Sequence, residues 1–421
     1  MKKYDLIVVG GGLTGVAAAV SAAREGLSVL LVEQSGALGG ALNTNLVYPF
    51  MRYWTDCPNG ERKWLSAGIF TEIFDKTEEL CKPMSKIDFS PEHMKVVLDR
   101  LCVEAGVELL FHANLFEAVT EGRQVKSVRA ATKAGSLDLE ADFFIDATGD
   151  GDLLAFAGCD FQLGRESDGL CQPMTTCFRL GNVQPLSIEE KKAIRPVLNE
   201  LYGKAKAEGR IHNPREDILW FRGTALGETV AHFNTTRVVK LDPTNPFDVS
   251  KAEVEARRQV LELVELLREV PAFAEATLIS VATAIGVRES RKLKGVHIIT
   301  AQELKNCTRF PDSIALGNYD IDIHNPEGAG TSHYYFAPGD YYTIPYRSLL
   351  PVEFDNLLTG GRCISATHEA QASIRIMPIC ATTGQAAGTA AAVAKKTGAT
   401  CHSVDIKAVQ AVLRQNGAAI D

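Results

Sequence analysis

The chain begins with two short apolar runs that flank a glycine-punctuated stretch of small residues. Residues 6–9 and 27–32 are mostly apolar, a pattern typical of strands buried on both faces of a parallel sheet. Between them, residues 16–24 have the composition of a tightly packed helix, and Gly26 stands where a helix C′ glycine is expected. The pattern predicts a strand–helix–strand unit.

The same reading continues to residue 145. A helix is predicted over 91–105, because Ser90 can cap it and Pro91 suits its first position. Residues 107–111 are the next expected parallel strand. Alternating segments then predict a small β-meander and a further strand, around residue 119, at 125–130, at 137–139 and at 143–145. Residues 50–85 are aromatic and are expected to be irregular.

The periodicity changes between residues 160 and 345. Residues 187–190 form a capping box ahead of a helix. Residues 250–269 predict an amphipathic helix whose apolar positions are Val254, Leu261, Val264 and Leu267. The chain then returns to an apolar strand that enters Gly360 and Gly361. A long alanine-rich helix follows over 380–396, between Pro378 and Gly398.

The turn after the first predicted strand carries the most specific motif. Gly10, Gly12 and Gly15 fit G-x-G-x-x-G, and Glu33 follows the second strand. Such glycines permit a tight turn and close approach to a pyrophosphate, which the N-terminus of the helix attracts. Glu33 can accept both hydroxyls of an adenosine ribose. We therefore expect adenine-dinucleotide binding, against the alternative of a glycine-rich turn with no ligand.

These patterns predict an α/β fold with two domains. A Rossmann-like dinucleotide-binding domain, with a parallel sheet, helices and the small β-meander, is expected to be discontinuous. No second G-x-G-x-x-G occurs, so the remainder is expected to be an inserted α+β domain that covers the substrate. The predicted boundaries are 1–45, 86–160 and 350–421 for the nucleotide domain, and 46–85 and 161–349 for the substrate or cap domain.

Composition excludes several classes of protein. The chain has 421 residues, of which 46% are hydrophobic, enough for two cores. The net charge of −8 and the absence of a basic run argue against a nucleic-acid surface. Residues 386–394, the longest run of small apolar residues, are too short to span a bilayer. A cleaved leader would remove the first strand of the nucleotide motif, so a cytoplasmic protein is expected.

The ten cysteines never occur as C-x-x-C. We expect reduced thiols, with neither a metal site nor a disulfide framework.

Three further segments favour FAD over NAD. Gly39 and Gly40 follow the acidic strand end, where the backbone can run close under the pyrophosphate. Ala147-Thr148-Gly149 follows a strand, and Gly361-Arg362 follows another. The N-terminus of the helix after Pro378 can stabilise negative charge at N1–C2=O of a reduced flavin. The predicted cofactor-binding residues are Gly10, Gly12, Leu13, Thr14, Gly15, Glu33, Gln34, Gly39, Gly40, Ala41, Phe116, Ala147, Thr148, Gly149, Gly361, Arg362 and Met377.

With these segments in order, the chain resembles the FAD-dependent oxidoreductases of the glutathione-reductase-type (GR2-like) superfamily that carry one nucleotide domain, in particular an uncharacterised bacterial branch. The matching motifs lie at residues 10–15, 145–158, 286–295, 319–328, 342–351 and 360–392, the last being the most specific. The resemblance implies hydride transfer between N5 of FAD and a small organic substrate, with the electron partner left open. Residues 42–45 contain no histidine, which favours non-covalent FAD.

Several side chains could take part in the chemistry. Arg288, Arg291, Arg347 and Arg375 could hold an anionic substrate or offset charge on the reduced ring; alternatively, they pair with acids such as Glu289. Histidine titrates near neutral pH, which suits proton transfer. The histidine candidates are His324, His333 and His368, each with a structural alternative. Cys380 could have a lowered pKa at the helix start or could simply pack. Tyr341 and Tyr342 could line the ring or be strand aromatics.

Two other functions compete with a flavin-dependent oxidoreductase. One is a flavin-bound sensor or carrier without turnover, and the other is an NAD-dependent dehydrogenase. Buried ionisable groups facing N5 would favour the enzyme, whereas an apolar closed face would favour the sensor. The oligomeric state stays open.

Overall fold

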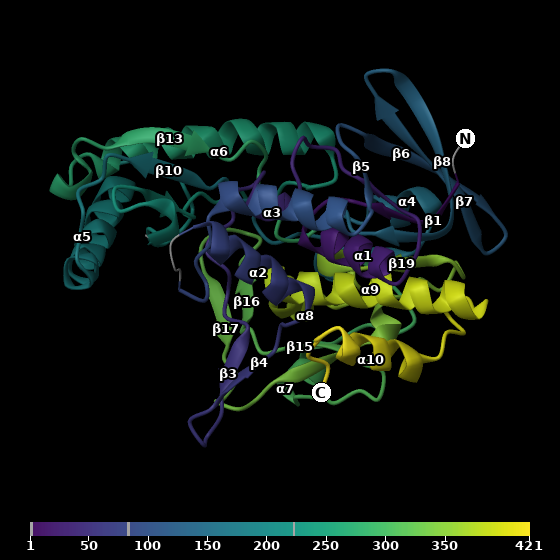
Figure 1. The fold of residues 1–421 in the computed structure, drawn as a ribbon. Coiled ribbons are helices and arrows are strands. Elements are labelled where there is room, and N and C mark those ends of the chain that lie inside the picture. Colours follow the sequence, from purple (N-terminus) through teal and green to yellow (C-terminus); the bar gives the residue numbers. More distant parts are fainter. Residues whose placement is uncertain (1–2, 82–84, 222–223) are drawn as a thin grey trace.

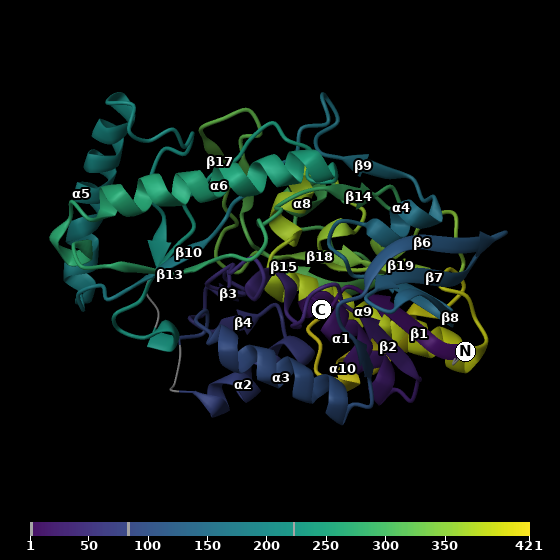
Figure 2. The ribbon, with the colours of Figure 1, turned by 90° about the horizontal axis from the view of Figure 1, so that it is seen from above.

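The computed structural model describes residues 3–81, 85–221 and 224–421. Three parts of the chain lie outside the described residues. They are Met1 and Lys2 of the predicted nucleotide domain, residues 82–84 of the predicted irregular stretch, and residues 222–223. A seven-stranded sheet lies at the centre of the main body (Figures 1 and 2). In spatial order its strands are β5 (Glu108–Leu110), β2 (Val29–Val32), β1 (Lys3–Val9), β8 (Gly135–Asp146), β7 (Gln124–Thr132) and β6 (Asn114–Glu121), with β19 (Leu357–Thr359) also paired to β8.

The strands predicted at 6–9, 27–32 and 107–111 are confirmed. All four residues of β2 are buried, as expected for a strand covered on both faces. One difference concerns β8, which joins the segments predicted separately at 137–139 and 143–145. Its first half pairs antiparallel with β7 and its second half pairs parallel with β1 and β19. One long strand therefore belongs to both the meander and the parallel sheet.

Helices cover one face of this sheet. They are α1 (Leu13–Arg24), α2 (Ile69–Leu80), α3 (Pro91–Glu104), α9 (Met377–Thr397) and α10 (Ile406–Gln415), and they share one core with that face. Figure 1 shows α1 and α9 running side by side. The other face packs against the meander and α4 (Asp152–Ala157). The predicted helices at 16–24, 91–105 and 380–396 are confirmed.

The segment predicted to be irregular contains α2, so that prediction is wrong for residues 69–80. Ile69, Phe70, Ile73 and Phe74 recur at helical spacing and are buried. The aromatic content hid this period, and the helix packs into the same core as α1 and α9.

A second unit has its own core. Figures 1 and 2 show α5 (Ile188–Ala207) and α6 (Pro246–Leu267) beyond one end of the main sheet. They pack on a small sheet, in spatial order β11 (Trp220–Phe221), β12 (Ala231–Phe233), β10 (Phe178–Gly181) and β13 (Thr277–Val281). The predicted capping box is confirmed, since the Ser187 and Glu190 side chains each bind the other residue's backbone N–H.

The predicted apolar face of α6 is partly wrong. Val264 and Leu267 are buried, but Val254 and Leu261 are exposed. The core side carries Ala252, Ala256, Val260 and Leu263 instead. These four residues are spaced by three or four, which keeps them on one side of a helix, whereas Val254 is two residues from Ala252 and Ala256. Small alanines set the buried face here, and large apolar residues alone do not identify it.

The remaining elements are short strand pairs and short helices. The two-stranded pairs are β3 (Trp54–Asp56) with β4 (Arg62–Trp64), β9 (Phe161–Leu163) with β14 (Arg291–Leu293), β15 (Ser313–Gly317) with β18 (Tyr342–Pro345), and β16 (Ile321–His324) with β17 (Thr331–Tyr334). The short helices are α7 (Ala301–Lys305), α8 (His368–Ile374), η1 (Gly40–Leu42), η2 (Thr224–Leu226), η3 (Pro271–Phe273), η4 (Tyr346–Leu349) and η5 (Gly361–Cys363). β15 and β18 contribute Ile314 and Ile344 to the core beneath α9. Among the helices of residues 3–81, 85–221 and 224–421, none is both long and apolar enough to cross a membrane.

Candidate functional site

The turn between β1 and α1 leaves room for a phosphate at the N-terminus of α1. Gly10 has a φ of +100°, and a Cβ on it would lie 2.5 Å from the carbonyl oxygen of Ala147. A Cβ on Gly12 would meet nothing within 4 Å, so the space beside this residue is open. Gly12 provides no side-chain cap, and the first turn holds no acidic residue. The backbone N–H groups of this turn suit an anion.

Glu33 lies beside this turn at the end of β2. One carboxylate oxygen accepts the N–H of Gly11 at 2.6 Å and the other accepts the N–H of Ser35 at 2.7 Å. Each oxygen keeps a second lone pair, so the held carboxylate can still accept hydroxyl groups of a ribose. The side chain is thus fixed by its backbone contacts in the orientation that the prediction requires.

The predicted Gly-Gly pair lies against the phosphate turn. Gly39 forms a parallel β-bridge with Gly12, and its N–H donates to the carbonyl oxygen of Gly11 at 2.8 Å. Gln34 and Ala41 are exposed nearby in sequence. Phe116 lies apart on β6 with 42% of its surface exposed, and its predicted cofactor contact stays a prediction.

The N-terminus of α9 is brought to the same region by close packing on α1. A Cβ on Gly384 would lie 2.8 Å from the Cα of Thr14, and Gly388 approaches the backbone of Ala18 in the same way. Thr14 is buried by this contact and by Gly361. The first residue of α9 is Met377, which is partly exposed, and its N-cap makes no side-chain hydrogen bond. This uncapped end suits a partial negative charge.

The segments at 147–149 and 361–362 are tied to each other. Arg362 donates to the carboxylate of Asp150 at 2.7 Å and to the carbonyl oxygen of Val287. The Thr148 hydroxyl donates to buried Asp146 at 2.7 Å and accepts the N–H of Asp152. These contacts hold the two turns together, and direct contact of Thr148 or Arg362 with a cofactor stays a prediction.

These residues therefore fit FAD in three respects. The open space at Gly12 can take the pyrophosphate, the fixed carboxylate of Glu33 can take the adenosine ribose, and the uncapped end of α9 can face the N1–C2=O side of the ring.

A cluster of charged side chains lies next to this end of α9, at β16 and the end of α8. His324 Nδ1 accepts from Arg237 at 3.1 Å, and His324 Nε2 lies 3.4 Å from Asp322. Asp322 also lies 3.8 Å from Arg375, the residue that ends α8. Tyr319 donates its hydroxyl to Asp322 at 3.1 Å. These contacts join three separate segments of the chain.

Burial sets the protonation states in this cluster. Burial lowers the pKa of His324 to about 3, and the positive charge of Arg288 adds to the effect, so the imidazole is neutral near pH 7. Burial alone would raise the pKa of Asp322, but His324 and Arg375 hold it well below its usual range. Both ring nitrogens of His324 are engaged, which suits a positioning residue better than a proton acceptor.

Arg288 differs from the other arginines of the cluster. Its guanidinium donates to the carbonyl oxygen of Pro173 at 2.7 Å and to the hydroxyl of Thr175, and it lies 3.4 Å from the amide oxygen of Asn234. All three acceptors are neutral. Burial, reinforced by the charge of Arg375, lowers the pKa of Arg288 to about 9.

His368 belongs to a second buried network. Its Nδ1 lies 2.7 Å from the carboxylate of Glu289, which also pairs with Lys292 and accepts the N–H of Gln172. Glu289 and Lys292 have no exposed surface. Burial alone would raise the pKa of Glu289, but the hydrogen bond from His368 and the charge of Lys292 hold it below its ordinary value. A charged Glu289 fixes the proton on Nδ1 and leaves Nε2 as an acceptor.

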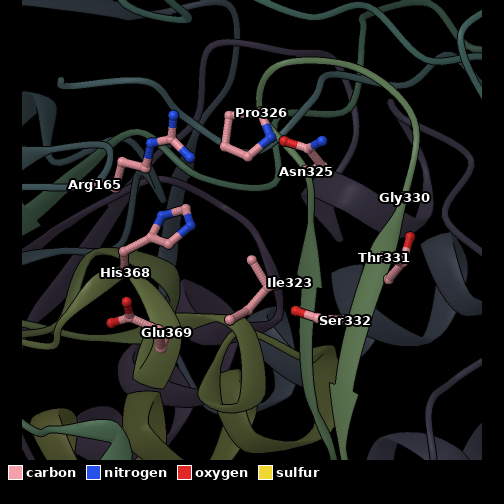
Figure 3. A pocket seen from close by; sticks show the side chains of 9 residues that line it. All are labelled: Arg165, Ile323, Asn325, Pro326, Gly330, Thr331, Ser332, His368 and Glu369. Atoms are coloured by element: carbon pink, nitrogen blue, oxygen red, sulfur yellow. The ribbon is translucent and has the colours of Figure 1, made fainter. Parts of the chain in front are cut away.

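Figure 3 shows the cavity that His368 faces. The ring projects from the start of α8 toward Arg165, which is itself paired with Asp168 and Glu327. No hydrogen bond to Nε2 of His368 forms within the described part of the chain. The cavity has a volume of about 480 Å³ and is lined by Arg165, Ile323, Asn325, Pro326, Gly330, Thr331, Ser332, His368 and Glu369.

Helix α8 links the two networks. His368, Gln371 and Arg375 follow at intervals of three and four residues, so they share one face. Along this face, His368 contacts Glu289, Gln371 donates to the carbonyl oxygen of Arg288 at 3.0 Å, and Arg375 lies near Asp322. Arg375 follows His368 by seven residues, which corresponds to a rise of about 10 Å along a helix.

Comparison with known proteins identifies the family. A profile of the family described as "FAD dependent oxidoreductase" matches residues 5–413, nearly the whole chain. The chain belongs to this family. The protein is thus an FAD-dependent oxidoreductase, and its cofactor is FAD.

Solved structures show low sequence identity to the oxidoreductase. A geranylgeranyl bacteriochlorophyll reductase-like protein of Thermoplasma acidophilum is 13% identical, with 99% of this chain and 83% of that chain covered and a TM-score of 0.48. A flavoprotein/dehydrogenase of Cytophaga hutchinsonii is 13% identical, with 98% and 83% covered and a TM-score of 0.47. The myxobacterial chondrochloren halogenase is 14% identical, with 99% and 79% covered and a TM-score of 0.45.

Other side chains that the sequence singled out in the oxidoreductase have structural partners. Arg291 pairs with Asp152 at 2.9 Å, and Arg347 pairs with Asp312 at 2.9 Å, which is the ion-pair alternative. His333 pairs with Asp320. Tyr341 accepts from Lys63, and Tyr342 bonds Ser373.

Cys380 is best explained by packing. Burial raises the pKa of its thiol to about 12, and its Sγ donates to the carbonyl oxygen of Arg375. All ten cysteines of the oxidoreductase are free thiols.

Sequence reasoning missed several members of the two networks. Asp322 could have been found, because it alternates with apolar residues two positions before His324 and therefore shares its strand face. Arg237 and Lys292 carry no comparable local pattern. Arg237 meets His324 from 87 positions away, and Lys292 pairs with Glu289 only three positions before it but also donates to the distant carbonyl oxygen of Gly164.

Proposed function

We propose that this oxidoreductase transfers a hydride between a small organic substrate and N5 of FAD, and that His368 exchanges the accompanying proton. The observation that carries the proposal is the pairing of His368 with buried Glu289 in a residue that lines a cavity of about 480 Å³. A histidine held in this way is ready to accept or return a proton.

The chain's own residues handle the proton. For an alcohol substrate, the carbon loses its hydrogen with the electron pair, the hydroxyl loses its proton to Nε2 of His368, and a carbonyl forms. Glu289 then stabilises the imidazolium, and Lys292 keeps Glu289 ionised. When bound, FAD supplies the two-electron acceptor or donor at N5. The reverse direction uses the same residues.

The course of residues 283–289 supports a ring position near His368. The N–H groups of Thr283 and Ala284 donate to the carbonyl oxygen of Thr44, close in sequence to the Gly-Gly pair. Val287 then contacts Arg362, and Glu289 contacts His368. This segment connects the predicted ring-binding loop with the proton-accepting pair.

We extend the proposal to the domain arrangement. Residues 1–45, 86–160 and 350–421 would form the FAD domain, and 46–85 and 161–349 would cover the ring. The side chain of Asn45 donates to the carbonyl oxygens of Ala284 and Ile285, which supports this contact. A structure with FAD bound and residues 161–349 remote from the ring would refute the arrangement. The order of the cofactor segments also supports membership of the glutathione-reductase-type superfamily.

Anaerobic reduction of the bound flavin tests the proposed reaction. The holoenzyme is mixed with a panel of small alcohols, hydroxy acids and amines, and separately with NADH and NADPH. Reduction is followed as the loss of flavin absorbance at about 450 nm. At least one organic compound should bleach the flavin. His368→Gln should slow that bleaching by about 10²–10⁴-fold. The matched control is His212→Gln, because exposed His212 also pairs through Nδ1 with a glutamate, at 2.7 Å.

Three outcomes would contradict the proposal. Bleaching by no organic compound would favour a sensor or carrier, and reduction of NAD⁺ by protein without flavin would favour an NAD-dependent dehydrogenase. Equal rates for His368→Gln and His212→Gln, with both loaded with FAD, would remove His368 from the reaction.

A further inference from the structure

The charged cluster beside α8 contains more positive charge than its acids balance. Three of its arginines each lie within 4 Å of a carboxylate: Arg215 near Asp217 at 3.0 Å, Arg237 near Glu216 at 3.4 Å and Arg375 near Asp322 at 3.8 Å. Arg288 makes no ion pair within the described residues, and the acceptors of its guanidinium there are neutral oxygens. Burying an unbalanced guanidinium costs free energy unless an anion shares the site.

Buried hydrogen-bond donors without a partner also favour an anion in this cluster. Nε of Arg375 and Nη1 of Arg215 are buried and have no hydrogen-bond partner among the described residues. The side chain of Arg215 is only 8% exposed. Oδ1 of Asp322, the acid nearest Arg375, is likewise unpartnered among the described residues, so the donor of Arg215 is the one that most needs a further acceptor. His324 does not supply the missing acceptor, because its Nδ1 already accepts from Arg237 and its Nε2 faces Asp322.

The cluster also shares the α8 face with His368. Gln371 holds the backbone of Arg288 against the α8 face that carries His368 at one end and Arg375 at the other. An anionic group near Arg288 and Arg375 would therefore be held about 10 Å from His368, the proposed proton acceptor, because that is the length of the helix segment between them. Binding at this distance orients the rest of a small molecule without contacting the reacting atoms.

We propose that the substrate carries a carboxylate, and that Arg288 binds it with help from Arg375. This inference rests on the proposed hydride transfer and names its substrate class. A carboxylate matches the planar fork of a guanidinium and brings one negative charge. Asp322, 3.8 Å from Arg375, would repel the second charge of a phosphate more strongly, which favours the monoanion.

The test measures binding of redox-inert anions to the oxidised holoenzyme. Propionate, malonate, succinate and benzoate are titrated against their matched amides and inorganic phosphate, and shifts of the flavin spectrum give Kd. We expect at least one carboxylate to bind at least tenfold more tightly than its amide. Arg288→Gln should weaken this binding at least tenfold, and Arg288→Lys should restore part of it. The control is Arg257→Gln, because Arg257 is exposed and pairs with Glu253 on α6.

Several results would overturn the inference. Equal binding of acids and amides, or an unchanged Kd in Arg288→Gln with full FAD occupancy, would exclude a carboxylate at Arg288. Binding of phosphate alone would assign another anion. A changed flavin potential with unchanged carboxylate binding would mean that Arg288 balances the reduced ring instead. The binding titration needs no turnover. Tight carboxylate binding to a holoenzyme whose flavin no organic compound reduces would therefore contradict the proposed reaction but support the carboxylate site.

Discussion

At the scale of single residues, two charged groups of this oxidoreductase are held in different ways. Glu289 is held by His368 and Lys292, so its charge is balanced inside the protein. Arg288 has only neutral acceptors. The balanced group suits a fixed role in proton transfer, and the unbalanced group suits a charge that arrives with the substrate.

Glu33 gives the most direct residue-scale prediction. Glu33→Arg should lose bound FAD, because the ribose loses its acceptor and the new cation is too bulky for the space beside Gly11. The ratio of flavin to protein absorbance after purification measures the loss. Glu33→Gln, which keeps an acceptor oxygen, should retain more FAD. Full occupancy in Glu33→Arg would show that the ribose binds elsewhere.

Two buried histidines predict how stability depends on pH. Burial lowers the pKa of His232 and of His324 to about 3. Between that value and about 6.5, only the unfolded chain binds these protons, so the free energy of unfolding rises with pH. Each histidine adds up to about 1.4 kcal/mol per pH unit in this window. Asp322, with a pKa below its usual range, loses its contribution only at still lower pH.

The variant His232→Phe tests this pH dependence. Its ring can keep the contact with Tyr48, whose centroid is 5.4 Å away, but cannot titrate. Denaturant unfolding between pH 4.5 and 6.5 should show a shallower pH slope than the wild type. An unchanged slope would mean that His232 does not set it.

At the scale of elements, the close packing of α9 on α1 positions the two helix ends that we propose for cofactor binding. Gly384→Ala should destabilise the protein by about 1–3 kcal/mol, because the new methyl group overlaps the backbone of Thr14. FAD affinity should fall as well, since Thr14 belongs to the phosphate turn. Gly203→Ala on α5, where a Cβ meets nothing within 4 Å, is the matched control and should stabilise by about 0.5–1 kcal/mol.

The N-terminus of α9 predicts a shift in flavin potential. Met377→Glu adds negative charge at its first residue, which should oppose the anionic reduced state by about 0.5–2 kcal/mol. The two-electron potential should therefore fall by about 10–40 mV relative to Met377→Gln. A redox titration of both FAD-loaded variants measures it. Equal potentials would show that this helix end does not face the ring.

The sequence predicted elements well where the signal was local. β1, α1 and β2 follow from apolar runs, a glycine turn and a small-residue helix, and the cap of α5 follows from Ser187 and Glu190. The face of α6 was only partly predictable, because alanines rather than Val254 and Leu261 contact the core. The double role of β8 depends on partners far away in sequence.

At the scale of the whole molecule, the two networks arise only when distant segments meet. Arg237 and His324 are 87 positions apart, and Glu289 and His368 are 79 apart. No periodicity or motif encodes such a contact. Glu33 and Gly10–Gly15 lie in one local unit, so their proximity could be predicted when the partners of His368 and Arg288 could not.

The most direct test of the account is the rate of anaerobic flavin reduction by an organic substrate whose reacting carbon carries deuterium in place of hydrogen. If the oxidoreductase takes a hydride from carbon with His368 receiving the proton, bleaching should slow with the deuterated substrate, and His368→Gln should slow it further. Bleaching that is unaffected by deuterium and by His368→Gln would contradict the proposed reaction.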